Sequence, residues 1–426
     1  MTGQGDQIEI GAIADDFTGA CDLAVMLRRS GMRVALRVGV PEGTLRERAD
    51  AVVVALKTRN IAPDLAVAES CKAARWLRDH LGAKRLFFKY CSTFDSTDAG
   101  NIGPVSDALM QEAGAKRAIA APAFPENGRR VFMGHLFVGD RLLSESSMAQ
   151  HPLTPMHDPD LVRVLSRQRS APVGLIDKTC IDLGAKAVRA AYQDADAGTM
   201  LICDAVCDGD LDTLAQAVLD APLVTGGSAI GAALARQIMA GRSAQRDAFT
   251  RPDQAQMRAL VLSGSGSEMT RAQVSQAIAV GYEAIKVGAA EAGQPEALAK
   301  QVLDQLAACS NPRQLVYATD RPEQVQAVQK VLGREEAGAR LETFFAILAQ
   351  QAVARGYNAF VVAGGETSGA VVRGLGVQEL AIGPEIAPGV PWAQGGGLWL
   401  ALKSGNFGQA DFFETAVSML EQGEPA

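Results

Sequence analysis

Long basic runs and long apolar stretches are both absent from this chain of 426 residues. Its 41 Lys and Arg are outnumbered by 48 Asp and Glu, for a formal net charge of -7, and they form no basic stripe, which disfavours a nucleic-acid partner. No segment approaches the ~18 uninterrupted apolar residues of a membrane span, and residues 1–10 lack the basic start and apolar stretch of a signal peptide. We therefore expect a cytoplasmic protein with no membrane partner.

Residue patterns that bind metals or form disulfides are also scarce. Seven scattered Cys make an odd number, unlike the even, closely spaced set of a disulfide framework. The nearest two, Cys203 and Cys207, have no second pair beside them, and the chain holds only four His, so a zinc site lacks ligands at a suitable spacing. We expect mostly reduced, buried cysteines, and the identity of any metal ligand is unknown.

The pattern that is present is an alternation of short β-rich runs with longer stretches of helical spacing, in a chain of ordinary composition with 48% hydrophobic residues. This alternation is typical of a mostly parallel sheet covered by helices. A chain of this length favours two domains over one. We predict an α/β fold with two domains, each with a mostly parallel sheet flanked by helices.

A polar stretch around Pro252 interrupts the alternation and marks the expected domain boundary. The strands expected before it cover residues 8–14, 51–56, 85–89, 173–176, 200–203 and 222–225. Those expected after it cover residues 259–262, 283–287, 314–317, 359–362 and 398–402. We therefore predict a first domain over residues 1–240, a linker over residues 241–257 and a second domain over residues 258–426.

Two segments depart from this scheme. Residues 130–144 hold two short β-rich runs on either side of Gly134-His135 and predict a hairpin appended to the first domain. Residues 395–397 are three consecutive glycines and are interpreted as a flexible loop.

Ligands of open parallel sheets bind beyond the carboxyl ends of the strands, so the residues that follow each expected strand are the candidates for function. In the first domain these are carboxylates, cations and hydroxyls, which suit a small polyhydroxy acid: Asp15, Asp16, Arg59, Lys89, Asp95, Ser96 and Thr97. In the second domain they are glycines, hydroxyls and a lysine, which suit phosphates: Ser263, Ser265, Gly364, Gly365, Glu366, Thr367, Lys403 and Gly405.

Each of these residues also has a purely structural interpretation. An Asp after a strand is often only a helix cap worth ~1 kcal/mol, and this interpretation is favoured for Asp16 alone. A cap needs one carboxylate, and a second brings unfavourable like charge unless a cation is near, which favours a functional role for Asp15. Lys89 can equally be a solvated strand end. If functional, Arg59 and Lys89 can hold a substrate carboxylate, while the aspartates are candidate bases or metal-facing groups.

Small glycine loops that open a helix let a phosphate approach backbone N–H groups closely. Three such loops in the second domain predict a nucleotide site, where Lys403 can neutralise phosphate charge. The Walker pattern and a complete Gly-x-Gly-x-x-Gly are both missing. A nucleotide, a cation and a carboxylate together favour phosphoryl transfer. A nicotinamide-dependent sugar-acid dehydrogenase and a non-catalytic sugar-acid sensor are the alternatives from other classes.

Four motifs carry a resemblance over almost the whole chain: residues 14–20, 89–105, 364–368 and 403–408. At these residues the sequence resembles the four-carbon acid sugar kinase family. The resemblance implies an amino-terminal sugar-acid domain, a carboxyl-terminal nucleotide domain and an active site in the cleft between them.

Within that family, the form Cys-Ser-Thr-Phe-Asp-Ser-Thr at residues 91–97 is similar to the 3-oxo-tetronate kinases, and it lacks the Leu-Arg that follows Asp-Ser-Thr in threonate and erythronate kinases. Residues 134–156 also resemble the 3-oxo-tetronate group, with no chemistry assigned to them. The resemblance implies a carbohydrate kinase that uses ATP and Mg²⁺ to phosphorylate the C4 hydroxyl of 3-oxo-tetronate. The alternative is a D-threonate or D-erythronate 4-kinase.

Carried over residue by residue, the resemblance implies a substrate side with Asp15, Arg59, Lys89, Asp95, Ser96 and Thr97, among which Asp15 and Asp95 are the catalytic candidates. It implies a nucleotide side with Ser265, Gly364 to Thr367 and Gly405. Ser263, Ser265 and Ser267 are too evenly spaced for the sequence to choose among them. The stereochemistry of the acid, the identity of the base and the oligomeric state, including a homo-oligomer, stay open.

Overall fold

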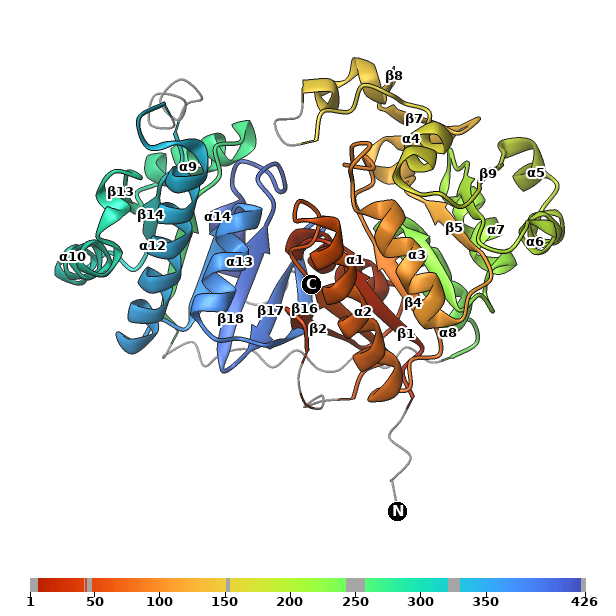
Figure 1. Ribbon diagram of the computed structural model, residues 1–426. Helices are drawn as coiled ribbons and strands as arrows, with labels where there is room; N and C mark the ends of the chain where they lie inside the picture. The colour runs from red at the N-terminus through yellow and green to blue at the C-terminus, as the bar shows by residue number, and fades with distance from the viewer. Residues whose placement is uncertain are drawn as a thin grey trace. The chain divides into compact units, whose positions relative to one another are not determined.

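The computed structural model describes residues 7–41, 43, 48–150, 154–242, 257–320 and 330–422. The chain splits into two compact units, Met1–Asp247 and Ala248–Ala426, called the first and second unit below (Figure 1). Both units are α/β, which confirms the predicted class. Most of the predicted linker, at residues 243–256, lies outside the described residues, so the domain limits at 240 and 258 stay predictions.

The first unit contains a parallel sheet in the order β2-β3-β1-β4-β11-β5-β10-β9. Its strands are β1 (Ile10–Ala14), β2 (Val34–Val38), β3 (Ala51–Ala55), β4 (Leu86–Lys89), β5 (Ala118–Ala121), β9 (Val173–Ile176), β10 (Met200–Cys203) and β11 (Leu223–Gly226). The central strands are buried on both faces, as expected of a parallel sheet covered by helices. Strands β2 and β5 are additions to the predicted set.

The helices of this unit form two packed groups. They are α1 (Phe17–Arg29), α2 (Pro63–Asp79), α3 (Ile102–Ala113), α4 (Leu161–Gln168), α5 (Lys178–Asp182), α6 (Ala185–Asp194), α7 (Asp208–Ala217) and α8 (Ser228–Met239). Helices α2, α3 and α4 pack in one group, and α1, α8, α7, α6 and α5 pack in the other. The chain moves across the sheet in one direction where it forms α2, α3 and α4, and in the opposite direction where it forms the other group. Because crossovers between parallel strands are right-handed, the two directions place the two groups on opposite faces of the sheet.

A small antiparallel sheet of β6 (Arg129–Phe132), β7 (His135–Val138) and β8 (Arg141–Leu142) confirms the predicted hairpin. Short 3₁₀ turns flank it at η1 (Pro125–Asn127), η2 (Leu143–Glu145) and η3 (Ser147–Gln150). The buried Asp204 accepts the Met133 N–H at 2.7 Å and the Gly134 N–H at 2.9 Å, which ties the hairpin turn to the end of β10. The hairpin therefore belongs to the first unit.

The second unit contains a sheet in the order β13-β14-β12-β15-β18-β17-β16. Its strands are β12 (Ala259–Ser263), β13 (Glu283–Lys286), β14 (Gln314–Tyr317), β15 (Ala359–Ala363), β16 (Glu379–Ala387), β17 (Val390–Gly395) and β18 (Leu398–Lys403). The strands from β13 to β18 in that order are parallel, whereas β17 runs antiparallel to both of its neighbours. The sheet is mostly parallel, as predicted.

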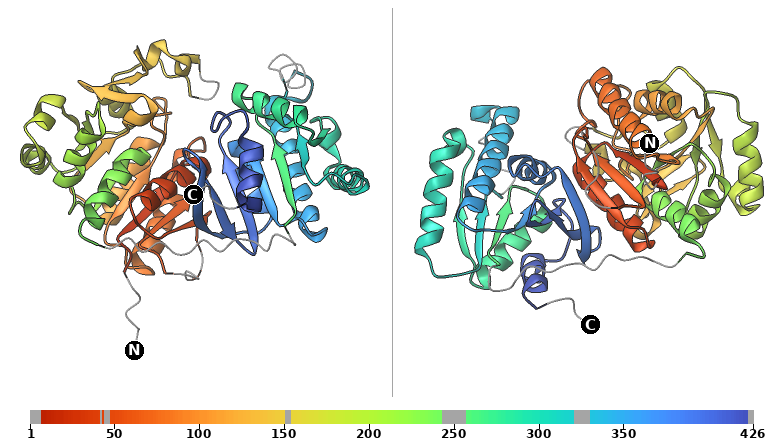
Figure 2. Two further views of the ribbon diagram at one scale, coloured as in Figure 1. Left: turned by 180° about the vertical axis from the view of Figure 1, so that it is seen from behind. Right: turned by 90° about the horizontal axis from the view of Figure 1, so that it is seen from below.

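Helices flank this sheet on both sides (Figure 2). They are α9 (Glu268–Ala279), α10 (Pro295–Ala308), α12 (Arg334–Ala354), α13 (Gly365–Gly374) and α14 (Phe412–Gln422), with the 3₁₀ turn η5 (Glu291–Gly293) before α10. Helix α12 packs against α10 and α13, and α14 packs against α9. None of the helices in the described ranges is long and apolar enough to cross a membrane.

The glycine triplet at residues 395–397 is a tight turn, so the prediction of a flexible loop is wrong. Gly395 pairs with Leu398 in the β17–β18 ladder, which leaves Gly396 and Gly397 as a two-residue connection. Their φ angles are 61° and 78°. Such a turn needs positive φ at both positions, which glycine adopts without steric conflict.

Candidate functional site

The ends of β1 and β3 bring Asp15, Asp16 and Arg59 together. The two strands are paired side by side, with Ala14 opposite Ala55, so the residues that follow them share one edge of the sheet. Arg59 donates from Nε to Asp15 Oδ2 at 2.9 Å and from Nη2 to Asp15 Oδ1 at 2.7 Å. Its Nη2 also lies 2.6 Å from Asp16 Oδ1. One guanidinium thus holds both carboxylates, of which that of Asp15 is buried and that of Asp16 is half-buried.

The two neighbouring aspartates differ in protonation behaviour. Burial raises the pKa of Asp15 and outweighs the charge of Arg59, which lowers it. Burial also acts on Asp16, but the charges of Arg59 and Lys89 and hydrogen bonds from Thr18 and Gly19 bring its pKa below the usual value. Asp16 is the N-cap of α1 and accepts the Gly19 N–H at 3.1 Å, so the capping interpretation of Asp16 is confirmed.

Lys89 ends β4, the other neighbour of β1, and is 3% exposed, so the interpretation of Lys89 as a solvated strand end is wrong. Its Nζ donates to the Tyr90 carbonyl at 2.9 Å. A Cβ atom on Gly19 would lie 2.4 Å from Asp16 Oδ1 and 3.0 Å from Lys89 Nζ. Because glycine has no Cβ, position 19 leaves space for the Asp16 carboxylate and the Lys89 ammonium beside the first turn of α1.

Asp95 faces the same guanidinium from the loop after β4. Its Oδ2 lies 3.9 Å from Arg59 Nη1, and its Oδ1 accepts the Thr93 hydroxyl at 2.6 Å. Phe94, which lies between Thr93 and Asp95 in the chain, is fully buried and has a φ of 54°. This value is in the left-handed region that non-glycine residues rarely occupy. The Phe94 ring packs edge-on against the Tyr90 ring, with the two ring centroids 5.5 Å apart. Burial of this ring holds the strained backbone that turns Asp95 toward Arg59.

Ser96 and Thr97 are held by a helix beyond this loop. The Ser96 hydroxyl accepts a hydrogen bond from Gln168 Nε2 at 2.5 Å, and the Thr97 carbonyl accepts one from the same nitrogen at 2.7 Å. The Ser96 N–H points at Met156 Sδ at 3.4 Å. The first unit therefore gathers Asp15, Asp16, Arg59, Lys89 and Asp95 into one charged cluster and attaches Ser96 and Thr97 to α4.

Asn101 is a residue of this site that the sequence reasoning missed. Its Nδ2 donates to the Thr58 carbonyl at 2.7 Å and to the Ile61 carbonyl at 2.9 Å, and it lies 3.3 Å from the Arg59 carbonyl. Asn101 therefore clamps the loop that carries Arg59. The only signal for it was its place in the motif Gly100-Asn101-Ile102-Gly103, which is part of the family resemblance.

In the second unit three loops meet where the adjacent parallel strands β12, β15 and β18 end. Gly364 has a φ of 120°, and a Cβ on it would lie 3.3 Å from the Ser265 backbone nitrogen. A Cβ on Gly405 would lie 2.5 Å from Ser265 Oγ, and one on Gly264 would lie 2.2 Å from Thr367 Oγ1. Glycine at these points lets backbone from three loops approach closely.

Two helices begin at these loops and present their free N–H groups there. Ser267 is the N-cap of α9, and its hydroxyl accepts the Thr270 N–H at 3.2 Å. Gly364 precedes α13, whose first turn carries Gly365, the exposed Glu366 and the buried Thr367. Helix N-termini beside glycine loops are suited to bind phosphate groups.

The three serines of the first loop have different environments. Ser263 is fully buried, and its hydroxyl shares a 2.7 Å hydrogen bond with the Thr319 hydroxyl at the end of β14. Ser267 caps α9. Ser265 is half-buried between them, and its hydroxyl accepts the Ser267 N–H at 3.2 Å. The Ser265 side chain lies close to both Gly364 and Gly405, whereas the Ser267 side chain lies close to Gly405.

Lys403 is fully buried and directs its ammonium at its own loop. Nζ lies 3.1 Å from Thr270 Oγ1, 3.0 Å from the Ser404 carbonyl and 2.9 Å from the Gly405 carbonyl. Burial lowers the pKa of Lys403 to about 7. Because three oxygens already accept its three protons, Lys403 joins the start of α9 to the Gly405 loop.

Gln273 on α9 adds a second clamp that the sequence reasoning missed. Its Nε2 donates to the Phe407 carbonyl at 3.0 Å and to the Gln409 carbonyl at 2.9 Å. Like Asn101 in the first unit, it is a buried amide that fixes a loop through backbone oxygens. A single Gln within a helical pattern carries no sequence signal for such a role.

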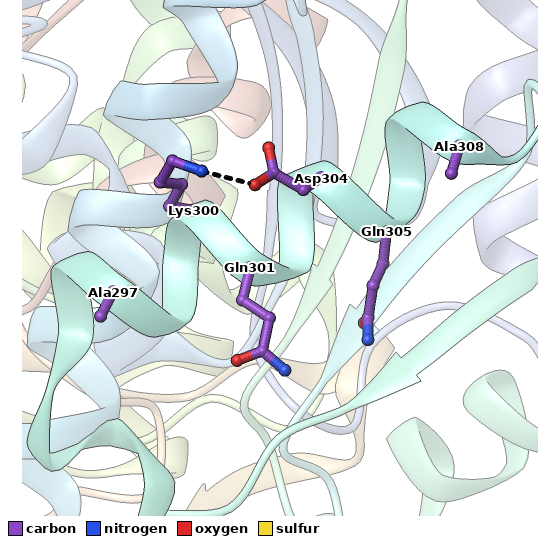
Figure 3. A pocket seen from close by; sticks show the side chains of 6 residues that line it. All are labelled: Ala297, Lys300, Gln301, Asp304, Gln305 and Ala308. Atoms are coloured by element: carbon purple, nitrogen blue, oxygen red, sulfur yellow. Dashed lines mark hydrogen bonds and ion pairs between the residues drawn. The ribbon is translucent and has the colours of Figure 1, made fainter.

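A shallow hollow of about 510 Å³ lies elsewhere, along one side of α10 (Figure 3). All residues that line it belong to that helix, and its two charged side chains pair with each other, Lys300 Nζ to Asp304 Oδ2 at 2.7 Å. The hollow brings none of the predicted site residues together. In the part of the chain that the structure describes, no group of three or more His, Cys, Asp and Glu side chains is arranged to hold a metal ion.

Comparison with known proteins bears directly on these two sites. Residues 10–234 match a family model described as a sugar-binding N-terminal domain, and residues 260–413 match one described as a nucleotide-binding C-terminal domain. The chain belongs to the four-carbon acid sugar kinase family. The charged cluster lies within the match to the family's sugar-binding domain, and the glycine loops lie within the match to its nucleotide-binding domain.

Members of this family with curated names are similar over nearly their whole length. The 3-oxo-tetronate kinase of Burkholderia multivorans is 49% identical, with 99% of each chain covered. The 3-oxo-tetronate kinase of Haemophilus influenzae is 41% identical, over 96% of this chain and 99% of the relative. A solved structure from Salmonella typhimurium LT2 is 39% identical with a TM-score of 0.86, over 96% of this chain and 98% of the other.

Proposed function

We propose that this protein is an ATP-dependent 3-oxo-tetronate kinase, which transfers the γ-phosphate of ATP to the C4 hydroxyl of 3-oxo-tetronate. The observation that carries the proposal is the 41% to 49% identity, over nearly the full chain, to relatives named 3-oxo-tetronate kinase. The chemistry of the two sites supports it, because one offers charged groups for a sugar acid and the other offers backbone for phosphates. A cytoplasmic location, where ATP is available, is part of the same proposal.

The charged cluster supports a division of roles between its carboxylates. Arg59 is bound by Asp15 through two hydrogen bonds, and its Nη1 has Asp95 as a distant partner at 3.9 Å. Nη1 is therefore the guanidinium nitrogen suited to a substrate carboxylate, together with Lys89. Among the described residues, no ion pair to Asp95 is shorter than its 3.9 Å contact with Arg59, so we assign to Asp95 the role of the base that takes the C4 hydroxyl proton. Asp15 then orients Arg59.

The second unit supports a nucleotide held by backbone. We assign the phosphates of ATP to the N–H groups near Ser265, Gly364 to Thr367 and Gly405, where glycine allows close approach. Lys403 then acts by holding the Gly405 loop. Mg²⁺ would accompany ATP at these loops and would neutralise phosphate charge.

Release of ADP from Mg-ATP tests the proposal. The protein is incubated with 3-oxo-tetronate, D-threonate, D-erythronate or no acid, and phosphorus NMR of the product shows whether the phosphate couples to the two C4 protons. We expect ADP to appear fastest with 3-oxo-tetronate. Faster release with D-threonate or D-erythronate would keep the kinase and change its substrate. Binding of the acid with no ADP release would favour a sensor.

A further inference from the structure

Gln168, the last residue of α4, contacts the substrate loop of the first unit at three points. Its Nε2 donates to Ser96 Oγ at 2.5 Å and to the Thr97 carbonyl at 2.7 Å, and its Oε1 accepts the Gly103 N–H at 2.9 Å. Gln168 has no part in the roles proposed above for the substrate site. The contacts connect α4 to the middle of the loop between β4 and α3 and to the first turn of α3.

These partners leave one orientation for the amide. The Gly103 N–H can only donate and the Thr97 carbonyl can only accept, so Oε1 must face the first and Nε2 the second. The remaining N–H of Gln168 points at Ser96 Oγ, which must therefore accept. The hydroxyl of Ser96 keeps its own proton to donate. Among the hydrogen bonds of the described residues, none uses the Ser96 hydroxyl as the donor, although Ser96 is only 4% exposed.

The loop is shaped around this amide by two glycines. A Cβ on Gly103 would lie 2.7 Å from Gln168 Cβ, and one on Gly100 would lie 2.8 Å from Gln168 Nε2. A Cβ on Gly100 would also lie 1.8 Å from Ser96 Oγ. Both glycines belong to the motif at residues 100–103, so the motif leaves the space that Gln168 needs to reach Ser96.

A second contact to Ser96 comes from a segment that the proposed function has not absorbed. Residues 134–156 resemble the 3-oxo-tetronate group of the family. At their end the buried Met156 places Sδ 3.4 Å from the Ser96 N–H. The Met156 thioether is a weak acceptor. It faces the Ser96 N–H and does not compete for the proton of the Ser96 hydroxyl. Ser96 is thus positioned by Met156 and by Gln168, while its hydroxyl stays available as a donor.

Resting on the proposed function, we propose that Gln168 is a positioning residue that fixes the Ser96 hydroxyl as a donor to the C3 ketone of a 3-oxo acid. A ketone oxygen only accepts hydrogen bonds, whereas a C3 hydroxyl also brings a proton that needs an acceptor. The substrate carboxylate is assigned above to Arg59 Nη1 and Lys89, which leaves the Ser96 hydroxyl for a neutral oxygen of the substrate.

The test compares kcat/KM for 3-oxo-tetronate with kcat/KM for D-threonate and D-erythronate in three variants. In Gln168→Leu the Ser96 hydroxyl is free to turn, and we expect the preference for the ketone acid to fall about 10-fold, the value of one hydrogen bond of ~1.4 kcal/mol. In Gln168→Glu the introduced carboxylate accepts the Ser96 proton, and we expect a larger fall. Ser166→Ala, which removes a hydroxyl bonded to Val162 on the exposed side of α4, is the matched control and should leave the preference unchanged.

A double-mutant cycle with Ser96→Ala separates positioning from a general structural role. If Gln168 acts through Ser96, Gln168→Leu changes the preference in the wild-type background and not in the Ser96→Ala background. Equal loss with ketone and hydroxyl acids, in both Gln168 variants and with thermal unfolding unchanged, would overturn the inference and leave the kinase proposal intact. Absence of ADP release with every acid in the wild-type protein would overturn the kinase proposal itself.

Discussion

Charged side chains crowd the strand ends of the first unit, whereas the strand ends of the second unit are crowded with glycine. In the first, the Arg59 guanidinium is surrounded by the carboxylates of Asp15, Asp16 and Asp95. In the second, Gly364 and Gly405 lie against Ser265, and the absence of a side chain on each glycine lets the loops approach one another closely. The same strand-end geometry therefore serves two kinds of recognition, one by charge and one by backbone.

A substitution in the charged cluster should lower the rate of phosphoryl transfer, and Asp95→Asn is expected to give the largest effect. The amide keeps the oxygen that accepts from Thr93 but cannot take a proton, so we expect kcat to fall about 10²–10⁴-fold with the KM for ATP nearly unchanged. Steady-state kinetics on both substrates measure it. Asp98→Asn, in the same loop but 68% exposed, is the control and should keep wild-type kcat. A normal kcat in Asp95→Asn would remove Asp95 as the base.

A side chain added at the glycine loops should weaken the binding of ATP by steric conflict. In Gly405→Ala the new methyl group would lie 2.5 Å from Ser265 Oγ, so we expect the KM for ATP to rise about 10–100-fold while the KM for the acid stays unchanged. Gly338→Ala, in α12 with no atom within 4 Å of the added Cβ, is the matched control. A change in the KM for the acid instead of ATP would reverse the roles of the two units.

Asn101→Ala tests whether the charged cluster depends on the backbone that supports it. The change removes the hydrogen bonds to the Thr58 and Ile61 carbonyls and loosens the loop of Arg59. We expect the KM for the acid to rise about 10-fold, with little effect on the KM for ATP. An unchanged KM for the acid would show that Asp15 and Asp16 hold Arg59 without this clamp.

The smallest predicted effect concerns Lys403 and the pH dependence of stability. Because burial lowers the pKa of Lys403 to about 7, the unfolded chain binds more protons than the folded chain above that pH, so stability rises with pH. Relative to Lys403→Met, wild-type protein should gain about 1 kcal/mol of unfolding free energy from about pH 7 to about pH 8.

Tryptophan fluorescence can follow that difference in the second unit alone. The chain has three Trp, of which Trp392 and Trp399 lie in the second unit and Trp76 in the first. Denaturant unfolding in a Trp76→Phe background then reports on the second unit. Parallel pH curves for the wild-type residue and Lys403→Met would show that the three oxygens around Nζ keep Lys403 charged despite its burial.

Some elements were beyond prediction for local reasons. Strand β5 is Ala-Ile-Ala-Ala and β2 carries Arg37, so neither has the run of β-branched residues that marks β3, Ala-Val-Val-Val-Ala. The clamps Asn101, Gln168 and Gln273 are single amides, and their partners are mostly backbone groups from other segments. Such contacts follow no spacing rule along the chain.

By itself, the sequence determined the α/β class and the strand ends where charged groups and glycines gather, because strands, turns and caps are recorded in local residue patterns. Only the tertiary structure decided which of these residues act together. It buried Lys89 and Lys403, gave the hydroxyls of Ser263, Ser265 and Ser267 different hydrogen-bond partners, and turned the Gln168 amide toward Ser96. Burial and hydrogen-bond direction arise when distant segments meet, and no local pattern encodes them.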